Sequence, residues 1–316
     1  MWRSLHLVAL AAAAAAGSGP KPLQFGTFAD TGIRLTDVLW TGTHFLYVEN
    51  TTNTVWAAGA HGTPLVRFAS MPNEVEETRC ALSPGLHGFA RGDLYCHAPD
   101  NTIYRIGADG SPTVFARLPD QSVSDGGLVF DTVGKLGFAL IAATGRSGAP
   151  EPGGGTVYAI DASGAVRTVG TYQGPGGADE VAVLPPHFGT AAGAVALTVD
   201  AGSRGAIVVM DVQGRARTVA SLPDGPNPIA VIKAPPRHRS ALVKPGLYVA
   251  ETATHDVFFV PAAYLSPYVG DLIVGSELEG LWWIVRPRGA GIQTLLVPTT
   301  LAPQVYNFEA ATYFPG

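Results

Sequence analysis

The chain has 316 residues, a formal net charge of −5 and 14% charged residues. An acidic chain of this kind lacks the basic face that nucleic-acid binding requires, so we expect no nucleic-acid partner. The 39 glycines and 25 prolines, without any long amphipathic helical pattern, favour many short strands joined by tight turns.

Residues 1–19 have the features of a secretory signal peptide. Arg3 supplies the positive flank, residues 5–16 form an apolar run, and Ala14, Ala15 and Ala16 offer a small-residue cleavage site. The run is too short to span a bilayer, and no other apolar stretch is long enough, so we expect no membrane span. We therefore expect a secreted, extracellular or periplasmic monomer whose single folded domain is residues 20–316.

A recurrent hairpin organises the rest of the chain. Its clearest copy is residues 156–171, in which two alternating segments flank a turn at 161–164. Asp161 can bond its own backbone there, and Gly164 can supply the positive φ that a short hairpin needs. Similar hairpins occupy residues 54–69, 102–118 and 206–222. A hairpin that recurs in this way indicates a repeat architecture.

The hairpins predict six units of strands, named A to D from the inside of the molecule outward. The expected strands, unit by unit, are 37–40, 45–48, 55–58 and 65–68; 79–82, 93–96, 103–106 and 113–118; 127–131, 136–141, 157–160 and 166–171; 180–184, 194–199, 207–211 and 216–222; 229–233, 246–250 and 257–260; and 271–274, 281–285 and 293–297, before a terminal strand at 307–314. Pairs of B and C strands recur every 40 to 50 residues or so, as in an all-β, six-bladed β-propeller.

Closure of the ring leaves alternatives open. Residues 257–260 fit strand C of unit five or strand A of unit six, and a seven-bladed ring is the alternative to six blades. A β-sandwich is the other candidate fold, although it does not explain the regular period. Residues 307–314 would complete the last blade or add to the first, and either arrangement hides edge strands.

The two cysteines, Cys80 and Cys96, lie in one predicted hairpin. An antiparallel hairpin centred on Gly88 places Cys80 opposite Cys96 and Leu82 opposite Leu94. In an exported protein this arrangement predicts a disulfide, with two buried free thiols as the alternative. A zinc site would need two further ligands at suitable spacing, and these are missing.

Polar residues mark the starts of the predicted inner strands. These positions are Asp37, Glu77, Asp125, Glu180, Asn227 and Glu309. Inner strands of a propeller all run the same way along the axis, so their first residues should meet at one mouth of the channel. Converging carboxylates repel one another unless protons, cations or basic side chains intervene. A Ca²⁺ ion is the simplest such partner, and channel water with loop capping is the alternative.

The same strings resemble the six-bladed propellers of the senescence marker protein/gluconolactonase family and its NHL-repeat relatives. Glu309 in FEAATYF resembles the Glu-Gly strand start of that family, and Asn227 in PNPIAVI resembles its Asn-Gly-Ile-Ala motif. Asp125 in SDGGLVF resembles its Asn-Asp-Gly segment, and Glu180 in ADEVAVLP stands where relatives carry Asp-Gly. The resemblance implies that Glu309, Asp125, Glu180 and Asn227 are ligands of a divalent cation, expected to be Ca²⁺.

Two functions follow from these observations. The first is an exported metal-dependent hydrolase of a lactone or other ester, in which the cation polarises the carbonyl and activates water. Glu180 or Asp125 would then be the general base. The second is a non-catalytic propeller that binds a small-molecule ligand or a protein partner on its channel face. A stoichiometric bound cation would favour the hydrolase.

Overall fold

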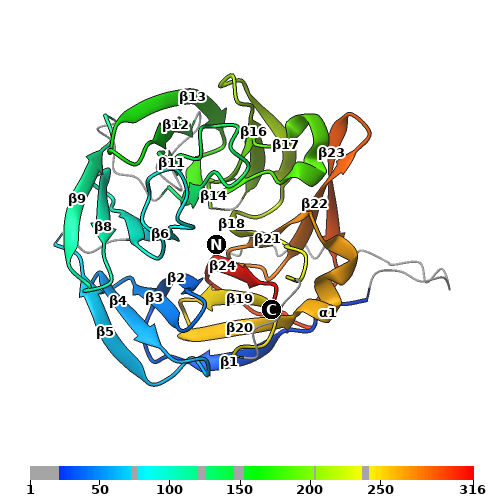
Figure 1. The fold of residues 1–316 in the computed structure, drawn as a ribbon. Coiled ribbons are helices and arrows are strands. Elements are labelled where there is room, and N and C mark those ends of the chain that lie inside the picture. Colours follow the sequence, from blue (N-terminus) through cyan, green and yellow to red (C-terminus); the bar gives the residue numbers. More distant parts are fainter. Residues whose placement is uncertain (1–20, 73–76, 120–125, 146–152, 203, 237–241) are drawn as a thin grey trace, which may run out of the picture.

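The computed structural model describes residues 21–72, 77–119, 126–145, 153–202, 204–236 and 242–316. Within these residues the strands form six four-stranded antiparallel sheets arranged around a central axis (Figure 1). The predicted all-β, six-bladed propeller is therefore confirmed, and the seven-bladed and sandwich alternatives are wrong. The predicted signal peptide at 1–19 lies outside the described residues.

The first four blades follow the chain, and each strand pairs with the next from the axis outward. Blade one is β2 (Leu35–Trp40), β3 (Phe45–Glu49), β4 (Thr54–Ala58) and β5 (Leu65–Ser70), and blade two is β6 (Arg79–Leu82), β7 (Leu94–His97), β8 (Thr102–Ile106) and β9 (Pro112–Arg117). Blade three is β10 (Leu128–Phe130), β11 (Leu140–Ala143), β12 (Gly153–Ile160) and β13 (Val166–Gly174), and blade four is β14 (Gly177–Val183), β15 (Val195–Asp200), β16 (Gly205–Met210) and β17 (Ala216–Leu222). A 3₁₀ helix, η1 (Pro186–Ala191), lies between β14 and β15.

The last two blades are interleaved along the chain. Blade five is β18 (Pro226–Val231), β21 (Leu272–Ser276), β22 (Trp282–Arg288) and β23 (Gly291–Val297), and blade six is β24 (Phe308–Phe314), β19 (Gly246–Glu251), β20 (Asp256–Pro261) and β1 (Gly26–Asp30). The short helices α1 (Ala262–Leu265) and η2 (Ser266–Tyr268) connect β20 back to β21. The expected assignment of 246–260 to unit five is therefore wrong. Residues 257–260 are in the third strand of blade six, which neither alternative proposed.

Both ends of the described chain close the ring in blade six. The red strand β24 lies nearest the axis and the blue strand β1 lies at the rim (Figure 1). Strand β24 pairs with β19, with Tyr313 opposite Leu247, and β1 pairs with β20. The backbone N–H of Leu23 also donates to the carbonyl of Pro298 at 2.8 Å. The terminal strand therefore completes the blade that contains residues 246–261, and not the unit at 271–297 or the first blade, which were the two expected arrangements.

Glycine recurs in these turns because a side chain there would clash with the neighbouring blade. In the turn between β12 and β13, the carboxylate of Asp161 accepts a hydrogen bond from the backbone N–H of Ser163 at 2.8 Å, as the sequence predicts. Gly164 has a φ of 86°, and a Cβ there would lie 2.5 Å from the Phe115 carbonyl oxygen on the neighbouring blade. The equivalent contacts are Gly110 with the Phe68 oxygen and Gly214 with the Val169 oxygen, each 2.1 Å from a Cβ. Blades two, three and four can thus approach the outer strand of the preceding blade closely.

The core consists of apolar layers between neighbouring blades. Trp282 and Trp283 on β22 show the arrangement, because successive side chains of a strand point to opposite faces. Trp282 is fully buried against blade six, with its ring 5.6 Å from that of Phe308. Trp283 packs on the other face, in the layer shared with blade four. These large rings fix blade five between its two neighbours.

The disulfide prediction is confirmed. Cys80 on β6 lies opposite Cys96 on β7, Leu82 lies opposite Leu94, and the two sulfur atoms are bonded with the Cα atoms 4.1 Å apart. A structural disulfide is typical of an oxidising compartment. Within the described residues, no helix has the length and apolar character needed to cross a membrane.

Candidate functional site

A buried arginine lies near the axis at the start of the inner strands. Arg79 is 1% exposed, and its Nη1 donates to the backbone carbonyl of Thr36. Its Nη2 lies within bonding distance of four side chains: Glu309 at 2.9 Å, Asp179 at 3.2 Å, Glu77 at 3.3 Å and Asn227 at 3.4 Å. Its Nε lies 3.6 Å from a carboxylate oxygen of Glu180. We call Arg79 and these five side chains the arginine cluster.

β-Bulges aim the cluster residues at the axis. The register of the inner strands shifts at Thr36 in β2, at Asp179 in β14, at Asn227 in β18 and at Glu309 in β24. A bulge adds a residue that has no partner on the neighbouring strand and redirects its side chain. Each of these four residues supplies an oxygen to Arg79. The bulges therefore build the cluster out of otherwise regular blades.

Two amides complete the bonding of Glu309. Asn227 donates its side-chain N–H to Glu309 Oε2 at 2.9 Å, and Asn307 donates to Oε1 at 2.9 Å. Both carboxylate oxygens of Glu309 are thus engaged, although the side chain is buried. Burial of a charge is tolerated only where it is paired and hydrogen-bonded in this way.

The electrostatics of the cluster are set by burial and by crowding of like charges. Burial raises the pKa of Glu180 to about 8 and, together with the nearby Glu77, raises that of Glu309 to about 8. Burial also raises the pKa of Asp179. Burial alone would lower the pKa of Arg79, but the carboxylates around it raise that pKa above its ordinary value. Near neutral pH the cluster thus contains a charged arginine and carboxyls that share protons.

Further acidic residues lie beyond the cluster and hold loops. Asp224 accepts hydrogen bonds from the backbone N–H groups of Leu278 at 3.3 Å and Glu279 at 3.1 Å. Burial, with a contribution from Asp200, raises the pKa of Glu277 to about 7. The acidic character of this end of the axis therefore extends past the atoms that contact Arg79.

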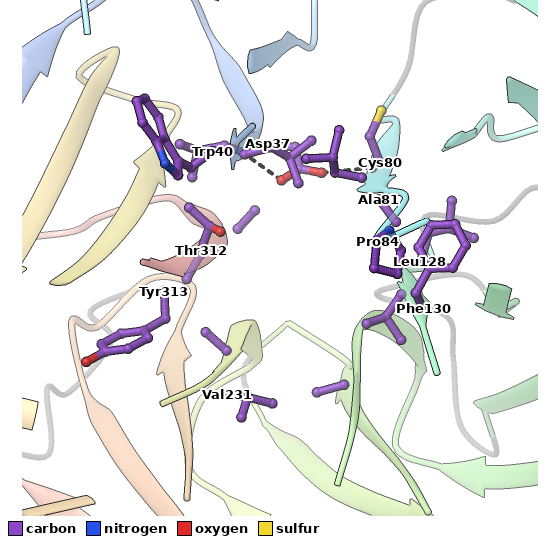
Figure 2. A pocket seen from close by; sticks show the side chains of 18 of the residues that line it. Asp37, Trp40, Cys80, Ala81, Pro84, Leu128, Phe130, Val231, Thr312 and Tyr313 are labelled. Carbon is purple, nitrogen blue, oxygen red and sulfur yellow. Dashed lines mark hydrogen bonds between the residues drawn. The ribbon is translucent and has the colours of Figure 1, made fainter. Parts of the chain in front are cut away.

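A cavity of about 450 Å³ runs along the axis on the other side of the cluster. All six inner strands line it, with aliphatic side chains such as Val38, Leu128, Val181 and Ile229 beside polar ones such as Ser83 and Thr312. Figure 2 shows Asp37, Ala81, Leu128, Val231 and Thr312 surrounding the open space. The cavity is a feature of the ring as a whole, because no single blade supplies more than one side of it.

The two ends of the cavity differ. Asp37 and Glu180 line the end next to the cluster, whereas Arg79, Asp179, Asn227 and Glu309 do not line the cavity. We call this the closed end. The exposed residues Arg91, Gly92 and Lys233, which follow the inner strands, line the other end, which we call the open end. The cavity is therefore reached from the loops that follow the inner strands.

Asp37 is held rigidly at the closed end. Its Oδ2 accepts from the backbone N–H of Cys80 at 2.8 Å, and its Oδ1 accepts from the N–H of Val38 at 2.7 Å. Burial raises its pKa to about 6, which these backbone bonds and Arg79 only partly offset. Together with Glu180, it gives the cavity two carboxyls that change protonation near neutral pH.

Searches against known proteins gave matches only among solved structures, since no family model and no curated protein matches this chain. The X-ray structure of a candidate gluconolactonase is 12% identical, with a TM-score of 0.49, over 90% of this chain and 84% of that one. The crystal structure of a nidogen/laminin complex includes a chain that is 13% identical, with a TM-score of 0.44, over 87% of this chain and 99% of that one. These likenesses concern the fold alone.

The structure brings most of the predicted site residues together. Glu180, Asn227 and Glu309 all contact Arg79, whereas Asp125 lies outside the described residues. A guanidinium thus stands among the oxygens that the sequence assigned to Ca²⁺, and these oxygens do not fit a second cation while Arg79 is there. Among the described residues, no group of three or more His, Cys, Asp or Glu side chains is arranged to hold a metal. The calcium site stays a prediction.

Sequence reasoning missed Arg79 and Asp179. Arg79 is the first residue of β6, so it occupies the same kind of position as the acidic residues. The signal in the sequence that could have identified Arg79 is a basic side chain at the start of one inner strand, where the other inner strands begin with acidic or amide side chains. The sequence points to Glu180 and not to its neighbour Asp179, because a bulge changes which residue of a strand faces the axis and leaves no mark in the sequence.

Proposed function

We propose that this chain is a binding propeller that holds a small-molecule ligand in its central cavity, which the ligand enters from the open end. One observation carries the proposal: the axis holds a cavity that all six inner strands line with aliphatic and polar side chains, next to the arginine cluster. Its volume of about 450 Å³ lies in the range of small-molecule sites, roughly 300–1,000 Å³.

Filling the cavity tests the proposal. Thr312 is half-buried and lines the cavity, so Thr312→Phe should occupy part of it. The neutral fluorescent probe N-phenyl-1-naphthylamine should bind the wild-type protein saturably and bind Thr312→Phe at least tenfold more weakly. Val114→Phe is the matched control, because Val114 is 51% exposed on the outer strand β9. Equal probe binding by Thr312→Phe and the wild type would contradict a ligand in the channel.

The metal-dependent hydrolase of a lactone or ester is the second candidate. Glu180 and Asp37 favour it, because both line the cavity and have raised pKa values of about 8 and about 6, near the pH at which a general base works. Calcium-dependent hydrolysis of δ-valerolactone that is lost in Glu180→Gln would support this function. Absence of turnover both with and without Ca²⁺ would contradict the hydrolase, and ligand binding would then be the remaining candidate function.

Export is part of the same proposal. It is supported by the apolar leader at residues 1–19 and by the disulfide between Cys80 and Cys96. N-terminal sequencing of the full chain, expressed with its leader and recovered from the periplasm or medium, should find that cleavage has occurred near residue 19. Retention of Met1 in a cytoplasmic product would contradict export.

A further inference from the structure

We propose that the ligand is an amphipathic carboxylate, whose apolar body fills the cavity and whose carboxylate lies at the open end between Arg91 and Lys233. The inference rests on the proposed binding function and specifies the class and orientation of the ligand. It is carried by two cationic side chains, from blades two and five on opposite sides of the ring, that line one cavity together with aliphatic side chains.

The loop that carries Arg91 is held in place by a backbone hydrogen bond, close packing and a stacked pair of rings. This loop joins β6 to β7, the two strands that the disulfide links. Gly92 N–H donates to the Ser83 carbonyl at 3.0 Å, and a Cβ at Gly85 would lie 2.6 Å from the Cβ of Arg91, so the loop folds tightly onto the arginine. The imidazole of His87 stacks on Phe138 of the next blade at 4.0 Å. The position of Arg91 is therefore set by the fold.

Lys233 reaches the opening from the opposite part of the ring. It follows β18 of blade five, and the preceding residue is fixed by two hydrogen bonds: Ile232 N–H donates to the Asp271 carbonyl at 3.0 Å, and Gly270 N–H donates to the Ile232 carbonyl at 2.8 Å. Both Arg91 and Lys233 have exposed surface and line the cavity, and partial burial of the ammonium group lowers the pKa of Lys233 from its ordinary value. No ion pair with a carboxylate of the described residues involves either one.

The charges at the two ends define one orientation. At the closed end the ionised form of Asp37 would repel a carboxylate, and an anion at that depth would also lose its hydration. At the open end a carboxylate meets two cations and keeps contact with water. Between the ends, aliphatic side chains such as Val181 and Ile229 offer contacts to an apolar body.

Three probes with the same ten-carbon chain test this inference: decanoate, decanol and decylamine, each titrated into the full chain by calorimetry. Decanoate should bind most tightly and decylamine most weakly. Arg91→Gln and Lys233→Gln should each weaken decanoate about fivefold, the size expected of an exposed charge pair, and leave decanol unchanged. Arg67→Gln is the matched control, because Arg67 is an exposed arginine on the outer strand β5.

The outcomes separate this inference from the proposed function. If decanol binds but decanoate binds no more tightly, or if decylamine binds most tightly, the carboxylate assignment is overturned and the binding function stands. If none of the three probes binds, or if Thr312→Phe binds decanol as the wild type does, both are overturned. Equal losses in Arg67→Gln and Arg91→Gln would show that only net charge matters, which also overturns the assignment to the open end.

Discussion

The two ends of the channel lie at opposite ends of the same inner strands, and they differ in burial, in the sign of their charges and in ion pairing. At the closed end, Arg79 pairs with buried carboxylates from several blades, and of the residues in the arginine cluster only Glu180 also lines the cavity. At the open end, Arg91 and Lys233 are exposed and have no carboxylate partner among the described residues. An internal ion-pair cluster can thus fill one end of a propeller axis while exposed cationic side chains line the other end.

The largest loss of stability is expected from the removal of Arg79 at the closed end. Arg79→Met leaves buried carboxylates without their cation, and we expect a loss of about 3–5 kcal/mol in the free energy of unfolding. The loss should be smaller at pH 5 than at pH 8, because protonation relieves the unpaired acids. Urea unfolding at the two pH values measures both quantities.

A surface pair provides the control for this variant. Arg105 is 47% exposed and contacts Asp93 at 2.6 Å, so Arg105→Met should cost no more than about 1 kcal/mol. Should Arg79→Met not fold, Arg79→Lys retains the charge without the fork of donors and should fold with an intermediate loss. Equal losses for the Arg79 and Arg105 variants would show that the cluster stabilises the protein no more than a surface pair.

The disulfide lies between the two ends, since Cys80 follows Arg79 and the linked hairpin carries Arg91. Replacing both cysteines by alanine should lower the free energy of unfolding by about 3 kcal/mol, as expected for a loop with a sequence separation of 16. Chemical reduction of the wild type should give the same unfolding midpoint as the double variant. A reduced wild type that matches the oxidised protein would contradict this contribution.

The pH dependence of the free energy of unfolding should reflect the protonation of the buried carboxyls at the closed end. The pKa values of Glu180 and Glu309 are raised to about 8 in the folded protein, whereas an exposed glutamate ionises near 4.3. The folded state then binds more protons than the unfolded state between these values, so stability should fall as pH rises through this window and level off above it. The slope is at most about 1.4 kcal/mol per pH unit for each group.

Glu180→Gln should make this slope shallower, because the amide does not titrate. Glu279→Gln is the matched control on a loop outside the cluster and should leave the slope unchanged. Thermal melts from pH 5 to pH 9 measure the slope. A stability that rises with pH across this window would mean that the buried carboxyls are ionised throughout.

The smallest effect is expected from calcium. Because Arg79 already lies among the candidate oxygens, saturating Ca²⁺ and excess chelator should give the wild type the same melting temperature. In Arg79→Met, Ca²⁺ should raise the melting temperature by mass action, because the oxygens are then free to bind it. A calcium-dependent rise in the wild type would instead support the metal site that the sequence predicts.

Local patterns in the sequence were enough to predict the number of blades, the strands of the first four blades and the disulfide. The turn with Asp161 and Gly164 is specified by residues next to one another, and the pairing of Cys80 with Cys96 follows from their spacing in one hairpin. The meeting of the inner-strand starts at one end of the axis also follows from topology alone. Glu180, Asn227 and Glu309 were found in this way.

The tertiary structure decided the remaining features because they depend on contacts between distant segments. Strand β18 pairs with β21 and not with the nearer β19, a choice between two apolar hairpins of similar pattern that only the packed ring makes. The bulges at Asp179 and Glu309 reverse the alternation by one residue, so the sequence could not say which side chain faces the axis. Arg79 finds its partners 100 and 230 residues away in the chain, a distance across which no local pattern carries information.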